Sequence, residues 1–233
     1  LGLRLRGAGR ITALPGYGEG AWTVQEEGSQ LVALALGVQP GEVVLDACAG
    51  RGHKTGLLAR AGGAVDAADL HPAKLDRLRE ELTRLGLAAR STFAVDWSRG
   101  SGEARPPYDA ILLDAPCSGT GTLLRRPDLL LRRRPENVGE LATLQLALLR
   151  RVAGLLRPGG RLVYAVCSVL REEGEAVVDA ALAAEPALAS SPFPPSPLRA
   201  MPGDAPTFRL LPHRHGTDGY FLASLVRRAS GPT

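Results

Sequence analysis

Short apolar runs recur along the chain, and several of them stop at a carboxylate. Residues 43–46, 64–69 and 111–114 each end on an aspartate. Continuous apolar runs of this length are typical of parallel strands that are buried on both faces. The expected strands are 43–46, 64–69, 91–95, 111–114 and 161–165.

Between these runs the apolar residues follow helical spacing. The segment 72–85 carries leucines every three or four residues, which places them on one helix face. Thr23 and Glu26 have the spacing of a capping box, which predicts a helix start at Thr23. A second helix is expected to begin at Leu57-Leu58, and three more are expected over 72–85, 138–156 and 172–184. Pro158-Gly159-Gly160 is expected to end the helix 138–156.

Strands thus alternate with helices, which predicts a doubly wound, Rossmann-like α/β fold with a mostly parallel sheet. After a Pro-rich loop at 186–206, the runs 208–211 and 220–226 indicate a closing antiparallel hairpin. We expect one domain over 23–233. The Gly- and Arg-rich segment 1–22 lacks periodicity and indicates short strands, a docking arm or the remnant of an RNA-binding region.

The composition narrows the class of protein. Hydrophobic residues make up 45% of the chain, yet no run reaches the length of a membrane span and no signal peptide is expected. Three separated cysteines argue against a disulfide framework and fit the reducing cytoplasm. The cysteines and four histidines lack metal-ligand spacing, and the net charge of +4 favours nucleic acid only weakly.

A glycine-containing turn at 47–55 joins the strand 43–46 to a helix. This arrangement brings backbone donors and a helix N-terminus to a ligand, although the spacing is not that of a Walker phosphate loop. Asp69 stands 23 residues after Asp46, where a Rossmann-like site holds ribose hydroxyls. The alternative for Asp69 is a charge at the N-terminus of the helix that Pro72 begins.

A second signal follows the strand that ends at Asp114. Pro116 fixes the backbone, so that Asp114 and Cys117 leave the sheet at a defined angle. Another cysteine, Cys167, follows the strand 161–165. Since ligands bind at the carboxyl ends of parallel strands, we expect one pocket to hold these residues together with Asp69 and Asp96. A thiol beside a nucleotide-like cofactor favours covalent catalysis, and the alternative is a buried structural cysteine.

The segment 122–135 carries five arginines among prolines and leucines. A solvated loop is the ordinary interpretation of such a segment. Arginines beside an active site also suit the phosphates of a nucleic acid.

In these motifs the chain resembles the catalytic domain of the Nop/Sun (NSun-type, RsmB-like) RNA cytosine-5 methyltransferases, which use S-adenosylmethionine. The resemblance runs from about residue 23 to the end. It is carried by 24–26, 29–31, Asp46-Ala47-Cys48-Ala49, Gly52, Lys54-Thr55, Asp69, Asp96, Asp114-Ala115-Pro116-Cys117-Ser118-Gly119, Cys167-Ser168 and Asp218-Gly219-Tyr220-Phe221.

The resemblance implies a cofactor site. The loop that wraps the methionine and ribose side of the cofactor is Cys48, Ala49, Gly50, Arg51, Gly52, His53 and Lys54. Asp69 is implied at the ribose hydroxyls, Asp96 at the adenine amine and Asp114 near the reaction centre. Where the family usually has Ala-Pro-Gly-Gly-Lys this chain has Gly-Arg-Gly-His-Lys, so Arg51 and His53 must point away from the cofactor or the loop path must differ.

The resemblance also implies the catalytic roles. Cys167 is the thiol that attacks carbon 6 of cytosine, and Cys117 assists release of the covalent product. Asp114 stabilises charge at the ring nitrogen, and Lys54 orients the base or the thiol. The expected substrate is ribosomal RNA, with tRNA as an alternative, and the expected protein is a cytoplasmic monomer without metal or membrane partner.

Three other functions remain open at this stage. A DNA cytosine-5 methyltransferase attacks with its Pro-Cys thiol, which would make Cys167 structural. A protein that docks RNA without catalysis would explain the altered glycine loop. A nicotinamide dehydrogenase is the third alternative, but the chain lacks the Gly-Xaa-Gly-Xaa-Xaa-Gly fingerprint.

Overall fold

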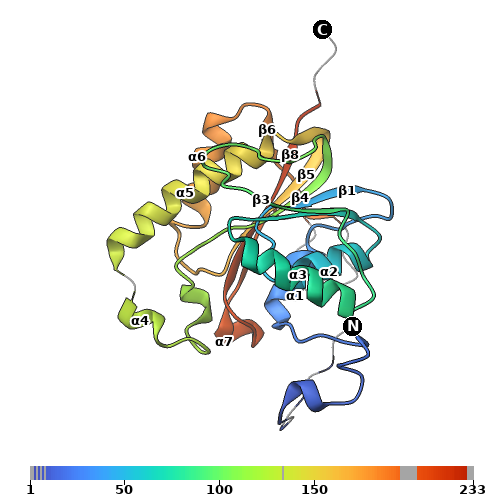
Figure 1. The fold of residues 1–233 in the computed structure, drawn as a ribbon. Coiled ribbons are helices and arrows are strands. Elements are labelled where there is room, and N and C mark those ends of the chain that lie inside the picture. The colour runs from blue at the N-terminus through green and yellow to red at the C-terminus, as the bar shows by residue number, and fades with distance from the viewer. Residues whose placement is uncertain are drawn as a thin grey trace.

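An eight-stranded mixed sheet forms the centre of the computed structural model, with strand order β3-β2-β1-β4-β5-β8-β6 and β7 paired to β8 (Figure 1). The structure describes residues 3, 5, 7, 9–132, 134–194 and 204–229. The strands are β1 (Val43–Asp46), β2 (Ala64–Asp69), β3 (Ser91–Ala94), β4 (Tyr108–Asp114), β5 (Leu156–Val166), β6 (Leu188–Ser190), β7 (Thr207–Leu210) and β8 (Tyr220–Arg227).

Helices cover both faces of this sheet. The helices are α1 (Glu27–Leu34), α2 (His53–Arg60), α3 (Pro72–Arg84), α4 (Leu129–Arg132), α5 (Pro135–Ala153), α6 (Glu175–Ala184) and α7 (Pro212–His215), with 3₁₀ turns at Ile11–Ala13 and Thr120–Thr122. The first three pack on one face, and α5 and α6 pack on the other (Figure 1). None of the helices in the described residues is long and apolar enough to cross a membrane.

The pairing directions confirm the predicted fold class. Strands β1 to β5 pair in parallel, whereas β8 is antiparallel to β5, β6 and β7. The predicted strands 43–46 and 64–69 match β1 and β2, and the helix predicted at 72–85 matches α3 to within one residue. The closing hairpin is present as β7 and β8.

Several local predictions were wrong. Thr23 does not cap the first helix, because its hydroxyl donates to Glu81 at 2.6 Å. Instead Glu26 is the N-cap, and its carboxylate accepts the Ser29 N–H at 2.8 Å. The second helix begins at His53, four residues before the predicted start at Leu57.

Strand β5 begins earlier than its apolar run does. The predicted helix 138–156 ends at Ala153, and Pro158-Gly159-Gly160 lies inside β5 instead of ending that helix. The pairing between β4 and β5 shifts register at this point, since Tyr108 pairs with Leu156 but Ala110 pairs with Arg161. Glycine accommodates such an irregularity because it has no side chain to place on either face.

The ends of the chain also differ from expectation. The described part of 1–22 contains a 3₁₀ turn and no strand, and its Tyr17 and Trp22 carbonyls accept hydrogen bonds from Arg84. The loop predicted at 186–206 includes the short strand β6. Residues 195–203 of that loop, and Arg133 of the arginine segment, lie outside the described residues.

A close backbone contact joins Gly219, the residue before β8, to the loop that follows β4. Gly219 N–H donates to the Gly121 carbonyl at 2.8 Å, and Gly121 N–H donates to the Cys167 carbonyl at 3.0 Å. A Cβ atom on Gly121 would lie 2.0 Å from the Gly219 carbonyl oxygen. Three segments from distant parts of the chain therefore meet at a point where only glycine fits.

Replacing Gly121 with alanine should lower the free energy of unfolding by about 1–3 kcal/mol, because the methyl group collides with backbone atoms that cannot rotate away. Chemical denaturation measures the change. Gly139→Ala is the matched control: Gly139 lies in α5 with nothing near its Cβ position, so alanine there should stabilise the helix by up to about 1 kcal/mol. Equal stability of the two variants would contradict this account of the contact.

Candidate active site

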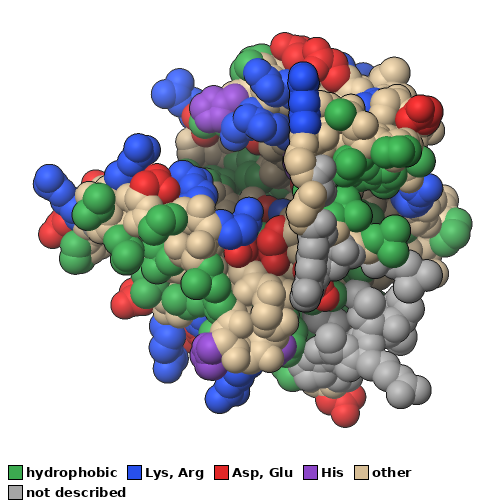
Figure 2. Space-filling view, turned by 90° about the horizontal axis from the view of Figure 1, so that it is seen from below, with side chains coloured by type: hydrophobic (Ala, Val, Ile, Leu, Met, Phe, Trp, Pro, Cys, Tyr) green, Lys and Arg blue, Asp and Glu red, His purple; other side chains and the backbone are tan. Residues whose placement is uncertain are grey.

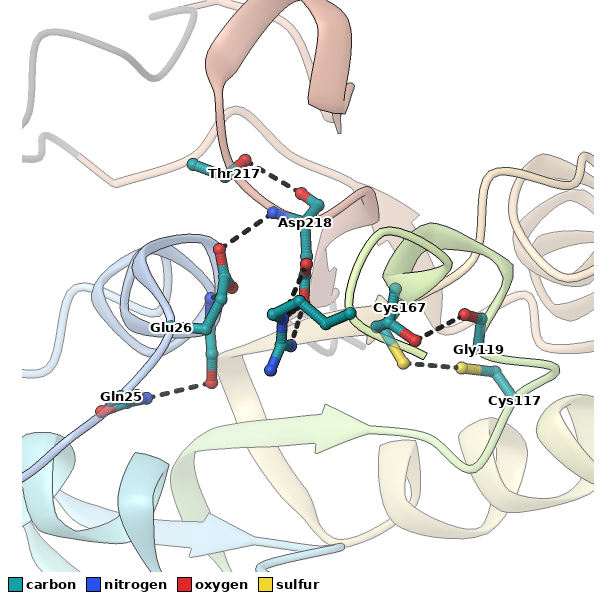
Figure 3. Close-up of polar contacts among 10 residues, drawn as sticks. Gln25, Glu26, Cys117, Gly119, Cys167, Thr217 and Asp218 are labelled. Atoms are coloured by element: carbon teal, nitrogen blue, oxygen red, sulfur yellow. Dashed lines mark hydrogen bonds and ion pairs between the residues drawn. The ribbon is translucent and has the colours of Figure 1, made fainter. Parts of the chain in front are cut away.

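Two thiols face each other where β4 and β5 end. The Sγ atoms of Cys117 and Cys167 lie 3.2 Å apart, and no disulfide bond joins them (Figure 3). This separation is that of a hydrogen bond, well above the length of a disulfide bond, about 2.05 Å. Parallel pairing of Asp114 with Ala165 sets both strand ends at one level, which is why the thiols meet.

The two thiols approach from opposite faces of the sheet. Cys117 packs against the core under α5, whereas Cys167 packs against the core under α1 and α2. Asp114 pairs with Ala165, so these two side chains lie on the same face of the sheet. Cys167 is two residues beyond Ala165 and lies on that face too, because side chains two positions apart along a strand point the same way. The sequence predicted one pocket for both thiols together with Asp69, Asp96 and Asp114. The structure brings the two thiols into contact, but only the three aspartates line the cavity described below.

Lys54 lies beside this pair at the start of α2. Its Nζ atom is 2.6 Å from Asp114 Oδ2, and both side chains are mostly buried. Burial alone would lower the pKa of Lys54, but the charge and hydrogen bond of Asp114 outweigh it and raise the pKa. The ammonium group therefore stays charged close to the thiols.

A cavity of about 220 Å³ lies at the carboxyl ends of the first four strands. Its walls combine acids with flat apolar surface, and α5 closes one side. The lining residues are Ala47, Cys48, Gly50, Asp69, Leu70, His71, Lys74, Val95, Asp96, Trp97, Asp114, Pro116, Leu144 and Leu148. This is the crevice expected for a doubly wound sheet, and we call it the strand-end crevice.

Asp69 organises the wall of the strand-end crevice. Its Oδ2 accepts the Gly50 N–H at 3.0 Å, and its Oδ1 accepts the His71 N–H at 2.9 Å. Lys74 approaches the same carboxylate at 3.2 Å. Asp96 lies at the crevice too, and the hydroxyl and N–H of Ser98 lower its pKa by donating to its carboxylate.

Not every residue predicted for the cofactor loop faces the crevice. Cys48 and Gly50 line it, whereas Ala49, Arg51, Gly52, His53 and Lys54 do not. Arg51 is exposed, and His53 lines a separate cavity of about 260 Å³ beneath the N-terminal arm. Both unusual side chains thus point away from the crevice, which was one of the two arrangements that the sequence allowed.

The turn that precedes α2 depends on Gly52. Its φ of 87° lies in the left-handed region, and a Cβ there would lie 2.6 Å from Leu78 Cγ. A side chain at this position would both strain the backbone and push α3 away. The glycine therefore fixes where Lys54 leaves the turn.

Asp46 is a fully buried carboxyl at the base of the loop. Thr55 donates its hydroxyl to Oδ2 at 2.7 Å, and Oδ1 has no hydrogen-bond partner among the described residues. Burial raises the pKa of this carboxyl to about 7. Asp46 thus holds a proton at pH values where an exposed aspartate is ionised.

Two buried networks next to the thiols escaped prediction. Glu173 lies behind Cys117 and accepts the N–H of Ser118 at 2.7 Å. On the other side, Asp218 pairs with Arg125, and its N–H donates to Glu26 at 2.9 Å (Figure 3). The only sequence signal for Glu173 was its place in an acidic run, which is equally typical of a helix N-terminus.

The fold and the strand-end crevice define an α/β protein of the kind that binds nucleotide-like cofactors. The sequence profile of the family described as 16S rRNA methyltransferase RsmB/F matches residues 33–226. The chain belongs to this family. Among the described residues, no cluster of His, Cys, Asp or Glu suitable for a metal ion is found.

Relatives agree with this membership. The chain is 39% identical over 235 residues to the "Probable ribosomal RNA small subunit methyltransferase B" of Synechocystis sp., covering 97% of this chain and 52% of that protein. It is 38% identical over 238 residues to the ribosomal RNA small subunit methyltransferase B of Salmonella arizonae, with the same coverages. The chain spans about half the length of these curated relatives.

A solved structure is similar as well. The crystal structure of NSun6 from Pyrococcus horikoshii with SFG matches with a TM-score of 0.81 and 27% sequence identity. The match covers 94% of this chain and 56% of the NSun6 chain.

Replacing Asp46 with asparagine should flatten the pH dependence of stability. Between about pH 4 and pH 7 the unfolded chain releases the Asp46 proton while the folded chain keeps it. Stability therefore falls as pH rises through this window, by at most about 4 kcal/mol, and levels off above it. The asparagine variant should lack this fall, which thermal denaturation from pH 4 to pH 8 would measure.

The control for this variant is Asp76→Asn, an exposed aspartate of α3. It should leave the pH profile unchanged. A profile of Asp46→Asn that still falls like that of the parent protein would place the titrating group elsewhere.

Proposed function

We propose that the chain is an S-adenosylmethionine-dependent RNA (cytosine-5-)-methyltransferase that acts on a cytidine of small-subunit ribosomal RNA. The observation that carries the proposal is the thiol pair beside the strand-end crevice. The names of the family and of the half-matched relatives support the reaction and the substrate class. A tRNA substrate is the alternative, and a methyl-transfer assay on ribosomal RNA and on tRNA distinguishes the two.

The residues of the strand-end crevice fit the proposed cofactor. Apolar walls from Val95, Pro116 and Leu148 suit an adenine ring, and the Asp69 carboxylate suits ribose hydroxyls. SFG in the NSun6 crystal structure is an analogue of S-adenosylmethionine, which supports the same cofactor here. When bound, this cofactor supplies an electrophilic methyl group.

Carbon 5 of cytosine is a poor nucleophile, and addition of a thiolate to the ring would activate it. Addition of a Cys167 thiolate to carbon 6 makes carbon 5 electron-rich, because the carbon 5–carbon 6 double bond becomes an enamine. Asp114 would share a proton with the ring nitrogen as negative charge develops there, and Lys54 would hold Asp114 in place. Once carbon 5 has bonded to the methyl group, a base removes the carbon-5 proton; the carbon 5–carbon 6 double bond forms again, the sulfur–carbon 6 bond breaks and the thiolate leaves.

Arginine and leucine side chains surround α4, which projects from the body of the protein (Figures 1 and 2). The exposed members are Leu124, Arg125, Arg126, Leu130, Leu131 and Arg132. Arginines suit phosphates, and apolar side chains suit unstacked bases. Since the thiols can only reach a base that has left its stack, a loop or bulge of folded RNA is the proposed substrate.

Two further expectations belong to this proposal. Three cysteines that form no disulfide bond support a reducing cytoplasm as the place where the protein acts. We also expect a monomer.

Asp69→Ala should weaken binding of S-adenosylmethionine by about 1–3 kcal/mol, or roughly ten- to hundredfold, because ribose hydroxyls lose their acceptor and Gly50 loses an anchor. Isothermal titration calorimetry measures the affinity. Asp76→Ala, on the exposed side of α3, is the control and should bind normally. Unchanged affinity in Asp69→Ala would remove Asp69 from the cofactor site.

The two thiols should differ when each is replaced by alanine. Cys167→Ala should abolish transfer of a labelled methyl group to RNA and form no covalent adduct. Cys117→Ala should permit addition but slow elimination, so a protein–RNA adduct that survives denaturing electrophoresis should accumulate. Label incorporated into RNA and not into DNA of the same sequence would support the RNA substrate.

The opposite pattern is equally informative. An adduct in Cys167→Ala and none in Cys117→Ala would reverse the roles and favour the DNA-type arrangement. An adduct in neither variant would count against covalent catalysis.

A further inference from the structure

A buried carboxylate, that of Glu173, is hydrogen-bonded to the residue that follows Cys117. Glu173 is completely inaccessible to solvent, although it belongs to a loop between β5 and α6 whose neighbouring Glu172 is exposed. A buried charge is costly unless donors surround it, so the position of Glu173 calls for an explanation.

Donors occupy both oxygens of the Glu173 carboxylate. Oε1 accepts the Ser118 N–H at 2.7 Å and the Gln145 amide at 3.0 Å, and Oε2 accepts the Ser118 hydroxyl at 2.5 Å. The Tyr164 hydroxyl donates to the Glu173 backbone carbonyl at 2.7 Å. These donors suit an ionised carboxylate, which only accepts hydrogen bonds.

The same contacts connect the two loops that carry the thiols. Ser118 follows Cys117 directly, whereas Glu173 lies on the loop that begins after Cys167. Hydroxyl contacts of Ser168 with Ser118 at 3.4 Å and with Thr120 at 3.1 Å add to this connection. Glu173 thus fixes the Cys117 loop relative to Cys167.

The charges around the two sulfur atoms are unequal. Asp114 from β4 and Glu173 face Cys117, together with Cys167 and the hydroxyl of Tyr164 from β5. From α5 comes the neutral amide of Gln145, and from α2 comes Lys54, which is paired with Asp114. The pKa of Cys117 is raised, first by its hydrogen bond with Cys167, then by burial, then by the charges of Cys167, Asp114 and Glu173.

We propose that Glu173 is the positioning residue of the thiol pair: its carboxylate anchors the Cys117 loop against the loop that follows Cys167, and its buried negative charge opposes formation of a thiolate at Cys117. The reaction assigned to each thiol rests on the proposed function, but the effect of Glu173 on Cys117 does not. Cys117 thereby remains a thiol that can give its proton during release of the product.

Glu173→Gln tests this inference because it keeps the size of the side chain and removes the charge. Alkylation by iodoacetamide, followed from pH 6 to pH 10 and resolved by peptide mass spectrometry, reports thiolate formation at each cysteine. In Glu173→Gln, Cys117 should react about tenfold faster at pH 8, which corresponds to a profile moved by about one pH unit. Cys167 should keep its profile.

Glu172→Gln is the matched control, since it removes an exposed charge one residue away. Glu173→Asp keeps the charge and should leave Cys117 within about twofold of the parent rate. Glu173→Asp also tests the inference if Glu173→Gln fails to fold. A tenfold faster alkylation of Cys117 in Glu173→Asp would overturn the inference. An unmoved Cys117 profile in folded Glu173→Gln, or equal shifts at both thiols, would overturn it as well.

The alkylation assay uses neither RNA nor cofactor. Failure of this inference is therefore distinguishable from failure of the proposed methyl transfer, which the thiol-to-alanine variants test separately.

Discussion

The parallel pairing of β4 with β5 is the constraint on which the site depends. Register along these strands brings Asp114 level with Ala165, so the residues that follow both strands emerge side by side. Cys117 and Cys167, fifty residues apart in the chain, then lie within contact distance. Neither thiol needs an unusual backbone conformation to reach the other, because the sheet supplies the alignment.

Charged side chains lie on both sides of the thiol pair. Lys54 and Asp114 form a mostly buried pair on the face of Cys167, whereas Glu173 lies on the side of Cys117. In a poorly solvated region such charges act over several ångströms with little screening. The two thiols therefore have different charged neighbours, although both belong to cysteine residues.

Much of this arrangement was predictable from local pattern. Apolar runs that end at Asp46, Asp69 and Asp114 define strands, and the crevice rule then gathers their ends. The Glu173 network was not predictable, since its donors Ser118 and Gln145 come from elements whose relative placement depends on tertiary packing. Predicted boundaries failed for a related reason: local propensity favoured Thr23 as a helix cap, but a long-range bond to Glu81 took its hydroxyl.

The contact between Glu26 and Asp218 joins residues 192 positions apart. Closing so long a loop costs conformational entropy, and contacts between residues far apart in sequence slow folding. During synthesis, a nascent chain would already carry Cys117 and Cys167 while Asp218 and Gly219 were still unmade. The two thiols therefore lack part of their structural setting until β8, the last strand among the described residues, has been synthesised.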